Sequence, residues 1–246
     1  MSDPFAIDLD RIAELLPRYA IDGPRYTSYP TAPVWNSDYG ADDYRADLAD
    51  DEIEASDGLS LYVHVPFCDS LCHFCACNKV ITTDHSRAAG FLDTIEREIE
   101  AVRAATRVPR AATQLHWGGG TPTWLAPAEI LRLFRSLTEA FPLRSDAEIS
   151  IEVDPRVTTH DHVAALAECG FNRISMGVQD FDPRVQQAIH RIQPAADTAR
   201  LVEWARRAGF ESVNFDLIYG LPYQTPATFE RTLDQLFAIG PDRIAL

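Results

Sequence analysis

The sequence predicts an α/β protein built around a six-stranded parallel sheet. Short apolar runs alternate with amphipathic helical patterns from residue 58 to the C-terminus, and Pro or Gly marks the ends of those patterns. The chain has 246 residues, of which 46% are hydrophobic, enough for one large domain with a real core. Strands that alternate with helices form parallel βαβ units with right-handed crossovers. An open or partial barrel fits this order.

The expected strands are short apolar runs, each followed by a turn. They are Ser60–Val65, Thr113–Trp117, Ile149–Val153, Asn172–Met176, Ser212–Leu217 and a last run that opens at Arg243.

The expected helices show apolar residues at helical spacing, and these residues are expected to face inward. Their markers are Leu92, Ile95, Ile99 and Val102; Ile130, Phe134, Leu137 and Phe141; Val163 and Leu166; Leu201, Val202 and Ala205; and Phe229, Leu233, Leu236 and Phe237. Prolines at a first helical turn and glycines after a last turn mark the helix ends. They are Pro127, Pro183, Pro226, Gly170 and Gly209.

Residues 1–57 form a separate N-terminal segment, and residues 58–246 form the α/β domain. The segment is rich in Asp, Pro, Tyr and Ala and has little strand character. Ile7–Tyr19 has helical apolar spacing, whereas Gly23–Trp35 is rich in proline and aromatic residues and is expected to be extended. The last expected strand opens only a few residues before Leu246, so we expect a C-terminal domain to be missing.

Charge and hydropathy limit the possible partners. The chain has 22 Lys and Arg against 37 Asp and Glu, a formal charge of −15, which argues against nucleic-acid binding. An anionic small substrate is still compatible with this charge if a local basic patch exists. No apolar run approaches the ~20 residues that cross a bilayer, so no membrane span is expected. The N-terminus lacks a secretory signal, which predicts a cytoplasmic protein whose thiols stay reduced.

Four of the five cysteines lie between Leu61 and Asn78. Pro66 is expected to end the first strand, because proline has no backbone donor, and this places the cysteines on a loop at the carboxyl end of that strand. Thiolates are soft ligands that suit zinc or iron–sulfur clusters.

The spacing of Cys68, Cys72 and Cys75 is CxxxCxxC, and no second Cys or His pair follows at the spacing of a zinc ribbon. Three thiolates from one loop can hold three irons of a cubane and leave the fourth iron open to a small molecule. A zinc site and ordinary buried cysteines are the alternatives. Cys77 is expected to be a non-ligand and Cys169 a packing residue.

Other unusual residues follow the carboxyl ends of the predicted strands, which share one rim in parallel α/β sheets and barrels. They are Gly118–Thr121, Glu152 with Asp154, Gly177 with Gln179, and Asp216. The sequence therefore predicts a binding site at this rim.

Several of these residues also have a plain structural interpretation. The glycine run lets backbone approach a ligand and offers unhindered amides, but it lacks the GxGxxG and GxxxxGK[ST] spacings and could be only a tight turn. Glu152 lies on an otherwise apolar strand, where an ion pair with Arg156 or Arg173 would account for it.

Four further residues have structural defaults. Arg191 by itself would be a solvated charge, and Tyr62 would be a core aromatic. Lone strand histidines are more often satisfied core residues than ligands, so His64 and His116 are not included in the site.

The loop resembles the radical S-adenosylmethionine family, which has CxxxCxxC with an aromatic residue, here Phe74, before the third cysteine. The longer pattern CxxxCxFCxCN after YVHVPF resembles the oxygen-independent coproporphyrinogen III oxidases (dehydrogenases). Further similar segments are RYTSYPTA from Arg25, HWGGGTPT from His116, EISIEVDPR from Glu148, FNRISMGVQDF from Phe171 and NFDLIYGLPYQT from Asn214. Ala76 replaces the usual Gly and His73 the usual aromatic, and neither change removes a ligand.

The resemblance implies a fold and a site. The fold is the six-stranded partial (β/α)6 barrel of radical S-adenosylmethionine enzymes, with an N-terminal segment over the active site in which Arg25 could meet a substrate carboxylate. Cys68, Cys72 and Cys75 would hold a 4Fe-4S cluster. The implied contacts to S-adenosylmethionine are Tyr62, Phe74, Gly119, Gly120, Thr121, Glu152, Gln179, Arg191 and Asp216.

The implied reaction is radical oxidative decarboxylation. An electron from the cluster, supplied by a reduced flavodoxin- or ferredoxin-type donor, would cleave S-adenosylmethionine to a 5′-deoxyadenosyl radical. Each such radical would take one hydrogen from a propionate side chain of coproporphyrinogen III, and loss of carbon dioxide and an electron would then leave a vinyl group. Two propionates would react in this way, giving protoporphyrinogen IX in haem biosynthesis. Two S-adenosylmethionine molecules, a monomeric protein and no catalytic side chain are implied. The alternatives are a related radical enzyme or haem chaperone, a zinc-binding interaction module, or a fragment that binds cluster and cofactor without turnover.

Overall fold

The structure is a computed structural model that describes residues 9–19, 31–50, 58–108 and 110–246. The chain divides into two compact units, Met1–Ala46 and Asp47–Leu246. The expected boundary between residues 57 and 58 stays a prediction, because residues 51–57 lie outside the described ones, as do Ile7 and Arg25.

The first unit is helical where it is described. It contains α1 (Leu9–Tyr19) and a 3-10 turn (Ala32–Val34), and α2 (Ala41–Leu48) spans the division between the units. The helical spacing in the N-terminal segment therefore predicted α1 correctly. On this helix Ile12 and Leu16 are 43% and 57% exposed.

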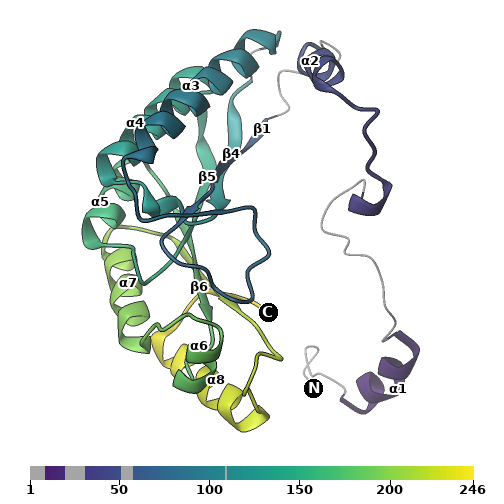
Figure 1. Ribbon diagram of the computed structural model, residues 1–246, viewed down its shortest axis with the longest axis vertical. Helices are drawn as coiled ribbons and strands as arrows, with labels where there is room; N and C mark the ends of the chain where they lie inside the picture. The colour runs from purple at the N-terminus through teal and green to yellow at the C-terminus, as the bar shows by residue number, and fades with distance from the viewer. Residues whose placement is uncertain (1–8, 20–30, 51–57, 109) are drawn as a thin grey trace, which may run out of the picture. The chain divides into compact units, whose positions relative to one another are not determined.

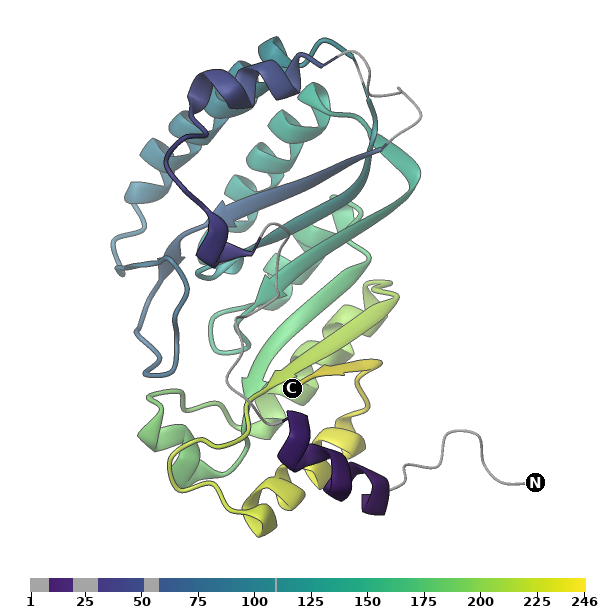
Figure 2. The ribbon, with the colours of Figure 1, turned by 90° about the vertical axis from the view of Figure 1, so that its right-hand side faces the viewer.

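The second unit contains a six-stranded parallel sheet in which the strands follow one another in chain order, as Figures 1 and 2 show. The strands are β1 (Leu59–Val65), β4 (Ala112–Gly119), β5 (Leu143–Val153), β6 (Arg173–Gln179), β7 (Ser212–Leu217) and β8 (Arg243–Ala245). Since β1 and β8 form the two edges of this sheet, the barrel is partial. The predicted fold class is confirmed.

Helices cover one face of the sheet. They are α3 (Arg87–Ala105), α4 (Pro127–Ala140), α5 (His160–Glu168), α6 (Pro183–Ala188), α7 (Ala195–Arg207) and α8 (Pro226–Ile239). Figure 1 shows all but the short α6 arranged along the outer side of the strands. The predicted markers of the helix ends hold: Pro127, Pro183 and Pro226 each open a helix, and Gly170 and Gly209 follow a helix end with φ of +85° and +93°.

Side chains alternate between the two faces of each strand. Leu115, Trp117 and Ile151 are fully buried under the helices. Their neighbours His116 and Ser150 point to the other face, where they hydrogen-bond to each other across β4 and β5 (2.7 Å). The sheet therefore has an apolar outer face and a polar inner face. It differs in this from parallel sheets that are covered on both faces, whose strands are usually apolar along their whole length.

Two expectations about the elements are wrong. Phe237 was expected to face inward but is 66% exposed, whereas its neighbour Leu236 is fully buried. Adjacent helical residues point about 100° apart, so Leu236 can face the core while Phe237 points away from it. β5 begins at Leu143 rather than Ile149, because a polar extended stretch precedes its apolar part.

The cysteine loop has a strand pair at its base that the sequence did not predict. β2 (Phe67–Cys68) pairs in parallel with β3 (Val80–Ile81), so Cys68 lies in a strand rather than on the loop itself. The Val80 amide donates to the Pro66 carbonyl (2.7 Å) and the Thr82 amide donates to the Cys68 carbonyl (2.9 Å). These bonds hold the two ends of the loop together.

Among the described residues, no helix is both long and apolar enough to cross a membrane.

The protonation of His162 in α5 provides a test of how this side chain is buried. Its Nδ1 accepts from the Thr159 amide (3.1 Å), so Nε2 carries the proton that is donated to the Leu125 carbonyl (3.1 Å). Burial lowers the pKa of His162, and the bond to Leu125 offsets this only in part. The folded pKa therefore lies below the unfolded value of about 6.5.

We expect the stability that His162 contributes to be fully present above about pH 6.5 and to be lost as pH falls from there through the lower folded pKa. Urea unfolding between pH 7.5 and 5.5 checks this. His162→Gln should lose less stability over this range, and His160→Gln, at a side chain that is 68% exposed, should behave as wild type. Equal acid sensitivity in all three proteins would contradict the assignment.

Candidate active site

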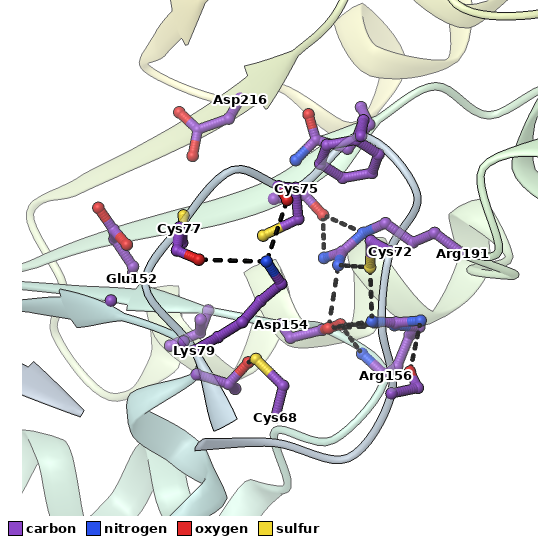
Figure 3. A pocket seen from close by; sticks show the side chains of 18 residues that line it. Cys68, Cys72, Cys75, Cys77, Lys79, Glu152, Asp154, Arg156, Arg191 and Asp216 are labelled. Carbon is purple, nitrogen blue, oxygen red and sulfur yellow. Dashed lines mark hydrogen bonds and ion pairs between the residues drawn. The ribbon is translucent and has the colours of Figure 1, made fainter. Parts of the chain in front are cut away.

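A cavity of about 280 Å³ lies at the carboxyl ends of the strands. Its wall comes from the cysteine loop, from the ends of β4, β5, β6 and β7, and from Arg191 after α6 (Figure 3). The chain positions of these residues range from Cys68 to Asp216, so only the parallel topology brings them together. The residues that were expected at one rim do lie together here, and their role as a binding site stays a prediction.

The four loop cysteines are free and all line the cavity. The thiol of Cys68 lies 3.4 Å from the Thr121 hydroxyl, and Cys72 is buried. Burial raises the pKa of Cys68 above its ordinary value, and the bond to Thr121 works against that shift. Burial and the adjacent Cys75 raise the pKa of Cys77 to about 11.

The donor set fits an iron–sulfur cluster better than a single ion. Over the described ranges, no three His, Cys, Asp or Glu side chains meet closely enough to hold one metal ion. A tetrahedral zinc site needs its donors around one point. A cubane instead takes each thiolate on a different iron. Figure 3 shows the sulfurs of Cys68, Cys72 and Cys75 around the cavity, which suits the larger group.

Two arginines meet the sulfur of Cys72. The Arg156 and Arg191 guanidinium groups each place an Nη atom 3.4 Å from Sγ. Asp154 accepts from both, at 2.6 Å from Arg156 and 3.0 Å from Arg191. Burial alone would raise the pKa of Asp154, but the bond from Arg156 and the charge of Arg191 outweigh it, so the pKa lies below its usual value.

Arg191 is buried, although position alone suggested a solvated charge. Its Nε and Nη2 donate to the Gly177 carbonyl at 3.2 and 2.6 Å, and Nη1 is shared between Asp154 and Cys72. Gln179 was expected on a loop but is the last residue of β6, with φ of +66°. Both side chains line the cavity.

The glycine run after β4 is required by close approach of other parts of the protein. A Cβ on Gly118 would lie 2.9 Å from the Glu152 carboxyl group, and one on Gly120 would lie 2.6 Å from the Pro66 carbonyl. The Gly120 amide donates to Val65 and the Thr121 amide to Phe67, both at 2.8 Å. These two amides are therefore used within the protein, contrary to the expectation that the run offers them to a ligand.

Glu152 faces the cavity from the inner side of β5, with its side chain 47% exposed. Its partner is His116, whose Nε2 lies 3.3 Å from Oε1. The structural alternative from the sequence is wrong, because Arg156 pairs with Asp154 and Arg173 pairs with Glu148. Since neither of these arginines pairs with Glu152, a structural ion pair with them does not account for the position of this carboxylate.

Asp216 on β7 also lines the cavity. Ser175 Oγ and Asn214 Nδ2 donate to its carboxylate at 3.0 and 2.8 Å. Burial raises the pKa of Asp216 and these bonds counteract it, with a net shift upward. Phe74 also lines the cavity and packs against a small cluster formed by Val185, Ile189 and Leu221.

Tyr62 is the one nominated residue that does not line the cavity. It is 59% exposed, stacks on His116 with ring centroids 5.9 Å apart, and its hydroxyl lies 3.0 Å from His64 Nδ1. Burial, then Glu152 and Cys77, raise its pKa. Its nominated contact with a cofactor stays a prediction.

The sequence reasoning missed several residues around this site. His64 and His116 were set aside as core residues, yet both belong to the polar inner face: His64 contacts Asn78 O (2.7 Å) and His116 contacts Ser150 Oγ (2.7 Å). Lys79 was not considered, although it lines the cavity and donates to the carbonyls of Cys75 and Cys77 (3.0 and 3.1 Å). The alternation of polar residues along the strands was the signal for the histidines.

The unusual His73 has a structural role in the loop. Its ring stacks on His190 with centroids 5.4 Å apart, and its Nδ1 lies 3.1 Å from the Ala188 carbonyl. His190 Nδ1 in turn lies 2.8 Å from the Leu71 carbonyl. These contacts connect the cysteine loop to the segment between α6 and α7, which carries Arg191.

Alanine substitutions of two glycines can test whether backbone atoms approach Gly120 as closely as the structure shows. They distinguish this close packing from the general effect of replacing a glycine. Gly120→Ala should lower the free energy of unfolding by about 1–3 kcal/mol, because backbone atoms of Pro66 and Phe67 occupy the space of a methyl group. Gly90→Ala, in α3 with open space around it, should instead be neutral or stabilising by up to about 1 kcal/mol. Urea unfolding of both variants is the measurement, and an unaffected Gly120→Ala protein would contradict the close packing.

Comparisons with known proteins were consistent with one another. The model of the Radical SAM superfamily matches residues 62–236. The chain is 46% identical over 236 residues to "Oxygen-independent coproporphyrinogen III oxidase" of Pseudomonas aeruginosa, covering 95% of this chain and 51% of that protein. The protein of the same name from Escherichia coli is 47% identical, with 94% and 50% covered.

Among solved structures, "Coproporphyrinogen III oxidase (HemN) from Escherichia coli" superimposes with a TM-score of 0.86 and 43% identity, covering 99% of this chain and 53% of that one. The chain thus spans about half the length of the relatives it matches. With a family match over most of its length, three free thiols in one cavity and an open parallel barrel around them, the chain belongs to the radical SAM superfamily.

Proposed function

We propose that this chain binds a 4Fe-4S cluster and S-adenosylmethionine and acts in the oxygen-independent oxidation of coproporphyrinogen III to protoporphyrinogen IX. One observation carries the proposal: the four free cysteines between Cys68 and Cys77, among them the three of the CxxxCxxC spacing, share a cavity with polar residues from the ends of four neighbouring strands. The superfamily uses both cofactors, and relatives at 42–47% identity carry the oxidase name.

Cys68, Cys72 and Cys75 would hold the cluster, and the remaining iron would bind S-adenosylmethionine. When bound, this pair of cofactors supplies a 5′-deoxyadenosyl radical from one electron. The protein's own part is to bind, orient and exclude water. No side chain is needed as nucleophile or general base, in keeping with the lack of a nominated catalytic residue.

The remaining nominated residues would bind S-adenosylmethionine. Glu152 and Asp216 present carboxylate oxygens that can accept hydrogen bonds from an amine and from ribose hydroxyls. Gln179 offers a neutral amide, and Arg191 has one N–H not engaged in the bonds described above. Because the amides of Gly120 and Thr121 already donate within the protein, the glycine run would contact S-adenosylmethionine through close approach of its backbone. Thr121 would contact it through its hydroxyl group.

The proposal includes the rest of the reaction's partners. They are coproporphyrinogen III, a second S-adenosylmethionine, and a reduced flavodoxin- or ferredoxin-type electron donor, with the protein a cytoplasmic monomer. The names of the relatives support the substrate.

The test is anaerobic reconstitution with iron and sulfide, followed by measurement of 5′-deoxyadenosine with and without coproporphyrinogen III. Deoxyadenosine together with protoporphyrinogen IX supports the full proposal. Deoxyadenosine without porphyrin product would limit the chain to cluster and cofactor chemistry, or to a related radical reaction. A sample that takes up zinc in place of iron and sulfide would refute the proposal.

The ligand assignment predicts unequal effects of cysteine substitutions. Cys68→Ala, Cys72→Ala and Cys75→Ala should each abolish the bound cluster, because each removes the only thiolate of one iron. Cys77→Ala is the matched control on the same loop and should keep its iron and sulfide. Iron and sulfide analysis after reconstitution measures this, and equal loss in all four variants would overturn the assignment.

Glu152→Ala should weaken S-adenosylmethionine cleavage about tenfold or more while leaving the cluster spectrum unchanged, since a hydrogen bond to a charged group is lost. Glu148→Ala on the same strand is the control, because Glu148 pairs with Arg173 and does not line the cavity. Cleavage is followed as 5′-deoxyadenosine per cluster. Unchanged cleavage by the Glu152 variant would remove this residue from the site.

A further inference from the structure

Among the three expected cluster ligands, Cys72 alone has cationic side chains on its sulfur. Arg156 Nη2 and Arg191 Nη1 both lie 3.4 Å from Cys72 Sγ, within the distance of an N–H···S hydrogen bond. Cys68 instead has the neutral Thr121 hydroxyl at 3.4 Å. Near Cys75 the cation is Lys79, which donates to backbone carbonyls. The three thiols thus have unequal electrostatic surroundings.

Arg156 is held firmly in its place by Asp154. Its Nε lies 3.0 Å from both carboxylate oxygens, and its Nη2 lies 2.6 Å from Oδ2, so the contact is bidentate. Nη1 reaches the Ser70 hydroxyl and the His190 carbonyl, each at 3.5 Å. The side chain is 20% exposed, against 9% for Asp154. Such an arrangement fixes the direction of the N–H group aimed at Cys72.

The charge of this group is positive. Two guanidinium groups and one carboxylate give 2 − 1 = +1, next to a sulfur whose pocket is largely closed to water. The charges facing it from the other elements are Lys79 on the loop, Glu152 on β5 and Asp216 on β7. Among the charged groups that line the cavity, Arg156 and Arg191 contact Cys72 Sγ, each at 3.4 Å.

Hydrogen bonds to the sulfurs and nearby charge set the reduction potential of an iron–sulfur cluster. A reduced cluster carries one more negative charge than an oxidised one. N–H donors and positive charge at a ligand sulfur therefore stabilise the reduced form and raise the potential. Arg191 is already a nominated cofactor contact, whereas neither the sequence nor the resemblance gave Arg156 such a role.

We propose that Arg156 is a positioning residue that donates to the Cys72 thiolate and, with Arg191 and Asp154, makes the cluster easier to reduce. This rests on the proposed function only in requiring that Cys72 bind a cluster. It deepens that function by assigning the control of electron uptake to a side chain outside the set of ligands and cofactor contacts. Asp154 keeps both guanidinium groups oriented, and it limits the net charge to +1.

The test compares the reconstituted wild-type chain of 246 residues with Arg156→Met in an anaerobic redox titration, in which the reduced cluster is followed by electron paramagnetic resonance. At the potential where wild type is half reduced, the ratio of reduced to oxidised cluster in the variant should fall about tenfold. That corresponds to a midpoint about 59 mV lower for a one-electron couple. Arg132→Met is the matched control, since Arg132 also makes a bidentate contact with one carboxylate, that of Glu96, but lies on α4. Its midpoint should equal that of wild type.

The outcomes separate this proposal from the proposed function. Wild type that takes up no cluster would overturn both. An Arg156→Met protein with the wild-type midpoint would overturn only the role of Arg156, as would a folded variant, judged by circular dichroism, that holds no iron.

A second variant decides the case in which Arg156→Met does not fold. Arg156→Lys keeps the charge but cannot hold Asp154 in two contacts and reach Cys72 at once. A midpoint below that of wild type supports the proposal, and the wild-type midpoint overturns it.

Discussion

The ion pairs of Asp154 with Arg156 and Arg191 organise the rim of this barrel. A buried carboxylate is costly unless it is paired, and the two guanidinium groups satisfy it while bringing three separate segments into contact. Asp154 follows β5, Arg191 follows α6, and Cys72 belongs to the loop after β1. The position of the middle cysteine thus depends on charges that lie more than eighty residues away in the chain.

One face of the sheet supplies the hydrophobic core, and the other face carries the polar groups that line the cavity. The outer face carries side chains such as Trp117 and Ile151, which are fully buried beneath helices and supply the hydrophobic core. The inner face carries His116, Ser150 and Glu152, which hydrogen-bond among themselves or face the cavity. Because the core lies on one side only, polar groups on the other side can serve ligand binding without loss of packing.

Prediction from sequence succeeded where the signal is local. Helix ends and the apolar centres of strands depend on neighbouring residues, so Ser212–Leu217 and Pro127 were placed correctly. It failed where partners come from far along the chain. His116 looked like an isolated core residue until β5 was placed beside β4. The amides of Gly120 and Thr121 looked free until the loop after β1 closed onto them.

Local patterning alone therefore decided the class of fold, the three thiols and the rim on which they lie, because periodicity and spacing act within a few residues. Tertiary packing decided which carboxylate each arginine neutralises: Arg156 holds Asp154, Arg173 holds Glu148, and Glu152 is left to His116 and the cavity. The contacts of Arg173 with Glu148 and of His116 with Glu152 arise from the register of the parallel strands, since the pairing of β5 with β6 and β4 determines which side chains meet.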